Sequence, residues 1–510
     1  MTTRRELPFV AAGVLPLLAR TAQAQPLSGT PAQPALRYTT PMPTGVAIPA
    51  TVETRFGRLN FFDGVPDASS TRLIYDNLDQ QRALQAYLLG LPAVNQAANR
   101  NAILTVGPIN TTVPIWERLV DSRTVELTAN NNTPYTWFWI DLRSGPLVVE
   151  VPPGVLGLIN DMFYSYVADV GLIGADRGQG GKYLLLPPGW SGAIPQGYEV
   201  LRPKTFQSFV AWRSFPVNGD LRPGVDAVKR FTKIYPPAQA ANPPTPTFVD
   251  MSERPFNMVG PSDYRFWEML NDVVQNEPTD ASDPITLGFF ASVGIVKGRP
   301  FQPDARMRRI LTEAAVAGDA TARALGYRAR DAEARIFPDR RWRFAFQGGY
   351  KFEHAPGVTN LDARAFFFFL ATGVTPAMDT RTVGEGSTYP WTAEDSSGNA
   401  LDGGKTYRLR LPGPVPVRTF WSVIVYDTQT RSMLQTDQRF PSVTSQSSNV
   451  QRNPDGSVDL WFGPTAPAGR ESNWVQTIQD KSWFTILRLY GPEQPWFDQS
   501  WRPGDIEVVV

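Results

Sequence analysis

The chain has 510 residues, and its 49 Lys and Arg residues almost balance its 48 Asp and Glu residues, for a net charge of +1. This balance gives no electrostatic footprint for nucleic acid or an anionic membrane, so we expect a neutral small molecule or glycan as partner, and no nucleic acid. His354 is the only histidine and cysteine is absent, which excludes thiol nucleophiles and metal sites built from cysteines or several histidines. Oxygen-only Ca²⁺ or Mg²⁺ sites stay open, but no calcium-loop spacing is present. We expect no metal and no cofactor.

A high content of Pro (47) and Gly (41), with only 19% charged residues, favours β structure with many loops. The chain is too long for one ordinary core, so two domains are expected. We predict an α+β protein, mainly β with a helical middle: two antiparallel β-sandwich or jelly-roll domains bridged by helices. The predicted divisions are a signal peptide (1–24), a flexible linker (25–54), an N-terminal β domain (55–250), a helical connecting region (251–375) and a C-terminal β domain (376–510).

Residues 1–24 have the pattern of a secretory signal peptide. Arg4-Arg5 precedes an apolar run, and Ala22-Gln23-Ala24 provides a cleavage site of the A-x-A type. The paired arginines also point to twin-arginine export. No later apolar run reaches the roughly 18 residues that span a bilayer. We therefore expect a periplasmic or secreted protein without a membrane span.

The first regular element is expected at residues 71–90. Apolar side chains there recur at the helical spacing of about 3.6 residues, which predicts an amphipathic helix. Gly90 and Pro92 predict its end.

Residues 128–152 combine three consecutive asparagines with an aromatic strand at 135–141, a turn, and a second strand at 147–151. This pattern predicts a β-hairpin. Alternation along the first strand puts four side chains on one face: Tyr135, Trp137, Trp139 and Asp141. Two interpretations stay open. The strand is either a core strand whose Asp caps a turn or one wall of a binding cleft.

From residue 220 the pattern becomes helical. Helices are expected at 220–234, 261–275, 285–296 and 304–336. Further on, residues 352–373 contain four consecutive phenylalanines, which predict a fully buried element. His354, just before them, is either a hydrogen-bonded structural residue or a proton-transfer group, because histidine alone titrates near neutral pH unaided.

The C-terminal part returns to strands separated by turns rich in Gly, Asn and Asp. They are expected at 407–411, 419–427, 457–464 and 483–492. In the last of these strands Arg488 lies among apolar residues. A buried cation there needs a carboxylate or carbonyl partner, and Asp427 is the candidate.

Several blocks of the sequence resemble a known pair of domains. YDNLDQQRALQAYLLGLP, NNNTPYTWFWIDLRSGPLVVEVP and GKYLLLPPG are similar to the domain of unknown function numbered 1254. DSSGNALDGGKTYRLRLP, PVRTFWSVIVYD, NPDGSVDLWFGPTAPAGRESNWVQT and WFTILRLYGPE are similar to its usual companion, numbered 1214. The resemblance covers most of residues 55–505 and implies two β-sandwich or jelly-roll domains in a bacterial, often exported protein, with no established activity. Asn132 stands where the family usually has Asp, so any step that uses this Asp would need another carboxylate here.

Two functions of different classes follow. The first is a periplasmic, metal-independent hydrolase with a cleft for a small-molecule or glycan-like ligand between the β domains, because domain junctions often hold ligands and a carboxylate pair can supply acid and base. The second is a non-catalytic envelope protein that binds a ligand or a protein. The residues predicted to carry chemistry are Asp141, Asp161, Asp427, Arg488 and His354. The residues predicted to bind the ligand are Asn131, Asn132, Tyr135, Trp137, Trp421, Trp474 and Tyr490.

Overall fold

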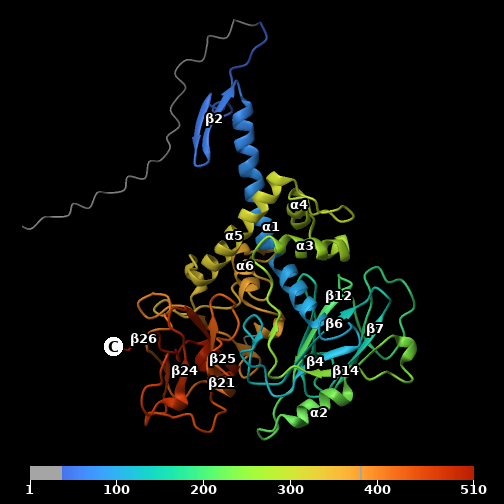
Figure 1. Cartoon of the computed structure of the whole chain (residues 1–510), viewed down its shortest axis with the longest axis vertical. Coiled ribbons are helices and arrows are strands. Elements are labelled where there is room, and N and C mark those ends of the chain that lie inside the picture. The colour runs from blue at the N-terminus through green and yellow to red at the C-terminus, as the bar shows by residue number, and fades with distance from the viewer. Residues whose placement is uncertain (1–36, 380–381, 510) are drawn as a thin grey trace, which may run out of the picture. The chain divides into compact units, whose positions relative to one another are not determined.

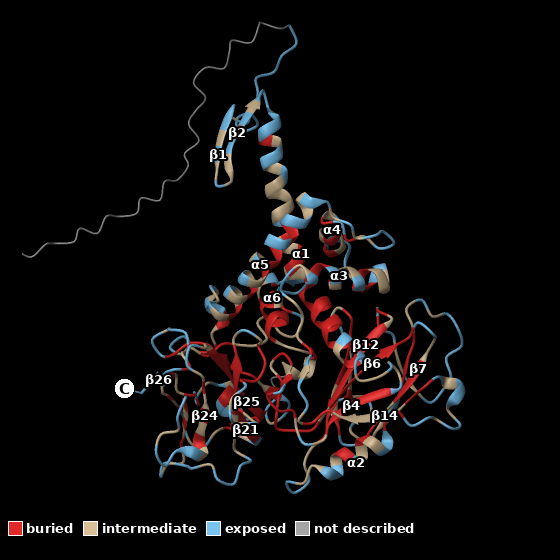
Figure 2. Cartoon of the chain, viewed as in Figure 1, coloured by how far each residue is buried: buried red, intermediate tan, exposed pale blue. Residues whose placement is uncertain are grey.

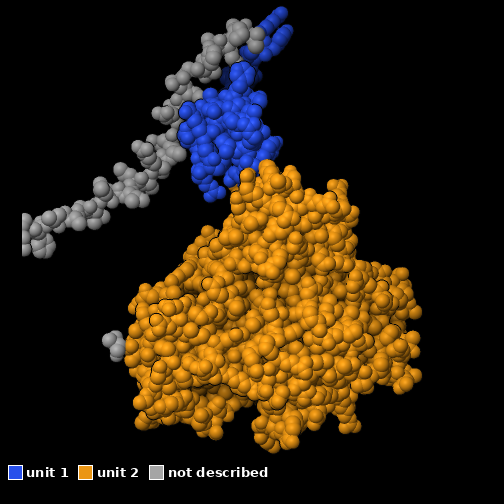
Figure 3. Space-filling view, viewed as in Figure 1, with its two compact units in different colours: residues 1–78 blue, residues 79–510 orange. Residues whose placement is uncertain are grey.

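The computed structural model describes residues 37–379 and 382–509. The predicted signal peptide and the first part of the predicted linker lie outside the described residues. The chain divides into two compact units, residues 1–78 and 79–510 (Figure 3). In the first unit, three strands form an antiparallel sheet in the order β1-β2-β3. Their bounds are β1 Thr51–Thr54, β2 Gly57–Phe62 and β3 Val65–Pro66.

Helix α1 covers Ala68–Leu104 and crosses the boundary between the two units. The predicted helix is therefore confirmed, but the end predicted at Gly90 and Pro92 is wrong, because both residues lie inside α1. Gly90 is a packing position: a Cβ atom there would lie 3.0 Å from Leu270 of α3 (Arg265–Asn276). Its lack of a side chain permits close contact between the helices, while Pro92 removes one backbone hydrogen bond without ending the helix.

The N-terminal β domain is a sandwich of two sheets. One sheet has the strand order β14-β4-β6-β12-β8-β9 and the other β11-β10-β7-β13. Their facing side chains, including Phe138, Val149 and Trp212, form one core, to which α2 (Arg222–Phe231) adds Val225. The strands are β4 Thr112–Trp116, β6 Tyr135–Asp141, β7 Leu147–Val151, β8 Leu156–Asp161, β9 Tyr166–Gly171, β10 Gly181–Leu185, β11 Glu199–Leu201, β12 Gln207–Arg213, β13 Lys233–Tyr235 and β14 Thr247–Asp250.

The hairpin predicted from β6 and β7 is wrong, although both strands exist. Strand β6 pairs with β4 and β12 in the first sheet, whereas β7 pairs with β10 and β13 in the second. The physical reason is that Ile140 of β6 and Val149 of β7 bury against the same core from opposite sheets. The turn between the strands is therefore a corner of the sandwich.

The C-terminal β domain is a second sandwich. Its sheets have the orders β18-β25-β21-β22, with β19 also paired to β25, and β24-β23-β20-β26. The core between them includes Leu409, Trp421, Leu460 and Leu487. The strands are β18 Ser387–Thr388, β19 Trp391–Thr392, β20 Tyr407–Leu411, β21 Val417–Asp427, β22 Ser442–Thr444, β23 Val458–Gly463, β24 Trp474–Gln476, β25 Trp483–Pro492 and β26 Ile506–Val508.

A third core, the central core, lies between the two β domains. It combines Trp139 from β6, Ile486 from β25 and apolar side chains of the helices. One sheet of each domain is therefore buried on both faces (Figures 1 and 2). The contributing helices are α1, α3, α4 Pro284–Ser292, α5 Ala305–Tyr327 and α6 Leu361–Leu370.

These elements confirm the predicted α+β class with a helical middle, and the phenylalanine run is buried as α6. Further short strands and a short helix are β5 Thr124–Val125, β15 Phe256–Asn257, β16 Glu353–Ala355, β17 Val358–Thr359 and α7 Gln494–Phe497. Within residues 37–379 and 382–509, no helix combines the length and the apolar character that crossing a bilayer requires.

Candidate functional site

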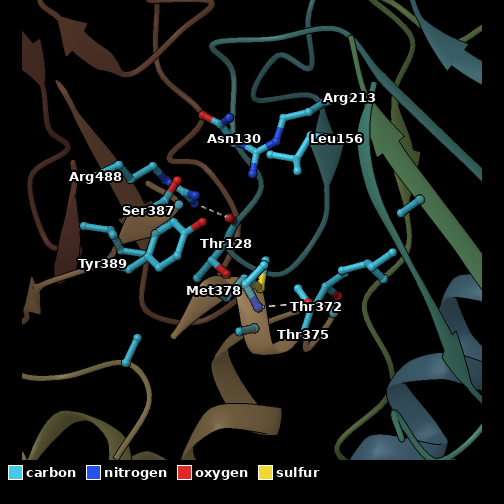
Figure 4. A pocket seen from close by; sticks show the side chains of 18 of the residues that line it. Thr128, Asn130, Leu156, Arg213, Thr372, Thr375, Met378, Ser387, Tyr389 and Arg488 are labelled. Carbon is cyan, nitrogen blue, oxygen red and sulfur yellow. Dashed lines mark hydrogen bonds between the residues drawn. The ribbon is translucent and has the colours of Figure 1, made fainter. Parts of the chain in front are cut away.

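A cavity of about 480 Å³ lies in the central core, between the two β domains. Strands β6, β8 and β12 line it from the N-terminal domain, β18 and β25 line it from the C-terminal domain, and α6 contributes phenylalanines. Its volume is in the range of small-molecule sites in proteins, and so is its composition, which is apolar with a few polar groups. Figure 4 shows those polar groups from close by.

Two buried arginines enter this cavity from opposite domains (Figure 4). Arg213 is the last residue of β12 and is 8% exposed, and Arg488 lies in the middle of β25 and is 7% exposed. Arg488 was predicted from the sequence; Arg213 was not. The signal was the same for both, a charged side chain at the end of or inside an apolar strand.

Arg488 is held by groups of both domains. Its Nη2 donates to the backbone carbonyl of Thr128 (2.7 Å) and to the hydroxyl of Tyr426 (2.9 Å), and its guanidinium lies 5.4 Å from the ring centre of Tyr389. The predicted need for a carboxylate or carbonyl partner is thus met by a carbonyl. The prediction that Asp427 is the partner of Arg488 is wrong. Asp427 pairs with Lys481 at 2.5 Å.

The register of the sheet explains why Asp427 cannot reach Arg488. Asp427 lies opposite Trp483, and Arg488 lies opposite Ser422, so the two are five residues apart along the pair of strands. Trp483 and Phe484 are neighbours whose side chains enter different cores. Because side chains alternate, Asp427 points away from the face that carries Arg488.

Arg213 lies among aromatic rings rather than acids. Its guanidinium carbon is 5.9 Å from the ring centre of Tyr135 and 5.7 Å from that of Tyr490, and it interacts with the Tyr389 hydroxyl. Contacts with aromatic faces stabilise a buried cation, but they do not neutralise its charge as an ion pair would. No carboxylate of the described residues pairs with Arg213, and tyrosine side chains are its polar neighbours.

Hydrogen-bond donors around the arginines are left without a partner. Among the described residues, neither arginine forms an ion pair, and the Nε of Arg488 and the hydroxyl of Tyr490 are buried without a hydrogen bond. Burial raises the pKa of Tyr490 to about 12, even with both arginines nearby. Its hydroxyl thus keeps its proton at neutral pH and can donate it in a hydrogen bond. Unpaired buried cations and donors are costly in a protein, and an anion in the cavity would compensate them.

A buried carboxyl, Glu126, also lines the cavity. It is 2% exposed, and its oxygens accept hydrogen bonds from the Thr372 hydroxyl (2.5 Å) and the Asn99 amide (3.3 Å). Burial raises its pKa from 4.5 to about 7, and these hydrogen bonds oppose the shift. Sequence reasoning missed Glu126. Its segment does not single it out, because the charged residues Asp121 and Arg123 lie just before it.

The aromatic strand positions this carboxyl. The indole N–H of Trp139 donates to Asn99 Oδ1 (2.9 Å), and the amide of Asn99 in turn donates to Glu126. On the other side, Thr372 Oγ1 is 3.0 Å from the hydroxyl of Tyr164. A buried hydrogen-bond network thus fixes the Glu126 carboxyl at the cavity wall.

Of the residues predicted to form a site, the cavity brings four together. Tyr135, Trp137, Arg488 and Tyr490 all line it, and two of them come from each β domain. The neighbouring Asn130 also lines it. The predicted Asn131 and Asn132 are buried next to it without lining it.

The three predicted acids lie elsewhere. Asp141 forms an ion pair with Arg143 in the sandwich corner; burial alone would raise its pKa, but hydrogen bonds from Arg143 and Gln207 outweigh this and lower it. Asp161, at the end of β8, is buried, which raises its pKa to about 6, and it accepts two backbone hydrogen bonds. Asp427 accepts from the amide of Gln429 and pairs with Lys481.

The remaining predicted residues also lie outside this cavity. Trp421 belongs to the core of the C-terminal sandwich, and Trp474 donates its indole N–H to Gly463. His354 is exposed on β16, with its Nδ1 3.4 Å from the Asn360 amide. It lines a second cavity of about 600 Å³, which shares Tyr389 with the first. Among the described residues, no group of three or more acidic or histidine side chains is arranged to hold a metal ion.

Comparisons with known proteins agree with this two-domain organisation. Residues 110–236 match the family model described as "Protein of unknown function (DUF1254)", and residues 386–494 match the model described as "Protein of unknown function (DUF1214)". The chain therefore contains the pair of domains that its sequence motifs resemble, in the expected order. No curated protein matches the chain.

Two solved structures are similar to the chain. The crystal structure of the VPA0106 protein from Vibrio parahaemolyticus covers 85% of this chain and 100% of its own, at 20% identity and a TM-score of 0.52. That likeness concerns the fold. A crystal structure of an uncharacterized protein from Burkholderia cenocepacia covers 86% of this chain and 97% of its own, at 13% identity and a TM-score of 0.37.

Proposed function

We propose that this two-domain protein binds a small organic anion, a carboxylate with an apolar body, in the cavity between its β domains. The observation that carries the proposal is the pair Arg213 and Arg488, two buried guanidiniums that face one cavity without a carboxylate partner among the described residues. A guanidinium presents N–H donors in a planar fork that matches a carboxylate. The nearly neutral net charge of the whole chain led us to expect a neutral ligand, but net charge does not report on a local pair of cations.

The walls of the cavity favour an apolar ligand body. Trp137, Phe367, Leu370 and Ile486 line it together with Tyr135. Contact with such walls contributes affinity through removal of apolar surface from water, and the two arginines would fix the orientation of the charged end.

We propose binding rather than hydrolysis as the primary function. The hydrolase hypothesis relied on Asp141, Asp161 and Asp427, and all three lie outside the cavity with hydrogen-bonding partners of their own. Two carboxylates on opposite sides of one scissile bond are what the acid-and-base mechanism requires. The non-catalytic alternative therefore has the better support.

Export is part of the proposal and depends on the sequence of residues 1–24. A protein exported in this way would meet its ligand outside the cytoplasm. The test is the mass of the protein recovered from the periplasmic fraction of a producing cell. A chain that begins at Gln25 supports export, and a full-length chain confined to the cytoplasm contradicts it.

Calorimetric titration with aryl and alkyl carboxylates, each paired with its uncharged amide, tests the binding proposal. We expect at least one carboxylate to bind about tenfold or more tightly than its amide, because hydrogen bonds to an ionised group are the stronger ones. Arg213→Met and Arg488→Met should each remove this preference.

The matched control is Arg431→Met. Arg431 is a buried arginine that also lies over an aromatic ring and donates to backbone carbonyls, but it does not line the cavity. This variant should keep the preference for the carboxylate. A panel in which no carboxylate binds more tightly than its amide, or in which the two cavity variants bind like the wild type, overturns the proposal.

A further inference from the structure

We propose, building on the function proposed above, that the ligand also carries a hydrogen-bond donor, a hydroxyl or an ammonium, at the end opposite its carboxylate, and that Glu126 receives this donor. The ligand class is then a hydroxy- or amino-substituted apolar carboxylate. The proposal rests on how polar groups are distributed around the cavity.

Two clusters of polar groups lie in the cavity wall. Arg213 and Arg488 lie together, since both interact with Tyr389. Thr372 lies apart from them, with Thr375, on another side of the cavity (Figure 4). Because the Thr372 hydroxyl bonds to Glu126 at 2.5 Å, the carboxyl belongs to this second cluster. The rest of the lining is mainly apolar and includes Trp137, Leu370 and Ile486.

Glu126 has hydrogen-bonding capacity to spare. An ionised carboxylate offers about four lone-pair sites, and its partners are the Thr372 hydroxyl, the Asn99 amide and the backbone amide of Leu127. All three of these groups are donors, so a further donor can still be accepted. A protonated carboxyl could instead donate to a hydroxyl oxygen of the ligand. A hydroxyl therefore fits both forms, and an ammonium fits the ionised form.

No cation among residues 37–379 and 382–509 compensates this carboxyl. The influences on Glu126 are burial and hydrogen bonds, with no charged group of the described residues among them. Arg213 and Arg488 thus serve a different part of the ligand. An isolated buried carboxyl is costly to keep, and such groups are frequent at functional sites.

Three isosteric probes test the proposal: phenylpropanoates with a para-ethyl, a para-hydroxymethyl or a para-aminomethyl group. All three carry the carboxylate and are similar in size. The ethyl end cannot donate a hydrogen bond, the hydroxymethyl end donates as a neutral group, and the aminomethyl end donates as a cation. We expect the hydroxymethyl or the aminomethyl probe to bind about tenfold more tightly than the ethyl probe in calorimetric titration.

Variants at position 126 test whether Glu126 causes the higher affinity of the donor probes. Glu126→Leu should remove the advantage of both donor probes over the ethyl probe. Glu126→Gln, which keeps the size of the side chain, should remove the advantage of the aminomethyl probe and serves as the second variant should the leucine variant not fold. Glu277→Gln is the matched control, because Glu277 is buried to a similar extent, has a pKa raised to about 7 by burial, and lines neither cavity.

The outcomes separate this inference from the proposed function. Ethyl, hydroxymethyl and aminomethyl probes of equal affinity, with all affinity lost in Arg213→Met, overturn the donor proposal and leave the anion site standing. A donor advantage that persists in both Glu126 variants also overturns it. Binding of the probes that does not depend on either arginine overturns the proposed function itself.

Discussion

The guanidinium of Arg488 donates a hydrogen bond of 2.7 Å to the backbone carbonyl of Thr128, so a strand of the C-terminal sandwich holds a loop of the N-terminal sandwich. Two neighbouring hydrogen bonds also connect the two domains. The Tyr426 hydroxyl donates to the carbonyl of Ala129 (2.8 Å), and the amide of Thr128 donates to the carbonyl of Arg431 (2.8 Å). Neither β domain could enclose the cavity alone, because the walls and the polar groups come from both.

Tyr426→Phe tests this connection. The change removes the donor to the Ala129 carbonyl and an acceptor of Arg488, and both groups are buried. We expect a loss of about 1–3 kcal/mol in the free energy of unfolding, the usual cost of leaving a buried polar group unsatisfied. Urea denaturation measures it. Tyr75→Phe, at an exposed position, is the control and should change little; equal stability of Tyr426→Phe and wild type would contradict the assigned role.

Arg213→Met should remove carboxylate binding without lowering the stability of the ligand-free protein. The Arg213 side chain is buried and pairs with no carboxylate of the described residues, so replacing it by an apolar side chain of similar length relieves a desolvation cost. In the absence of ligand we expect a melting temperature equal to or above that of the wild type, together with lost carboxylate binding. Arg343→Met is the contrast: Arg343 pairs with the buried Glu394 at 3.0 Å, and its removal should destabilise the protein, although by less than the roughly 3 kcal/mol of a fully unpaired charge, because Arg328 stays 2.9 Å from Glu394. A marked loss of stability in Arg213→Met would show that its charge is compensated within the protein.

The pH dependence of stability should change in Glu126→Gln. The pKa of Glu126 is raised from 4.5 to about 7, so between these values the folded state keeps a proton that the unfolded state releases. The carboxyl therefore lowers stability progressively as pH rises through this window, by up to about 3 kcal/mol, and has no such effect below it. Relative to the wild type, Glu126→Gln should gain stability between about pH 5 and about pH 8. Exposed Glu313→Gln should follow the wild type, and parallel curves for the wild type and Glu126→Gln would refute the assignment.

Asp141→Asn should show the opposite sign. Hydrogen bonds from Arg143 and Gln207 hold the pKa of Asp141 below its ordinary value. Its contribution to stability is therefore present above the pKa of the unfolded state and is lost as pH falls through the folded pKa. Unfolding at neutral pH should show a modest loss for the variant, which vanishes in acid, and ligand affinity should stay unchanged because Asp141 does not line the cavity. A variant with lost binding and wild-type stability would show that Asp141 contributes to the ligand site.

Local pattern predicted the faces of the strands well. Trp137 and Trp139 enter the central core, while Phe138 and Ile140 enter the core of the N-terminal sandwich, as alternation requires. The same reasoning identified Arg488 as a buried cation in need of a partner. The face on which a strand residue lies depends only on its position along the strand, because side chains alternate between the two faces.

Pairing between distant segments could not be predicted in the same way. The partner of Arg488 is a backbone carbonyl, which every residue has and no residue type marks. Arg213 and Glu126 join the cavity through sheet register and the packing of two domains, which the segment around each residue does not specify. The corner after β6 was mistaken for a hairpin because a turn between two strands fits both arrangements, and the choice depends on which core the second strand buries.

A pair of helix glycines gives a final test of the packing around α1. A Cβ atom at Gly318 of α5 would lie 2.3 Å from the ring of Tyr87 in α1, so Gly318→Ala forces the helices apart and should cost about 1–3 kcal/mol. Gly288 of α4 is exposed, with nothing within 4 Å of a Cβ atom, and Gly288→Ala should instead stabilise by about 0.5–1 kcal/mol through helix propensity. Urea denaturation of the two variants measures both signs. A gain for Gly318→Ala equal to that for Gly288→Ala would show that α5 does not pack closely on α1.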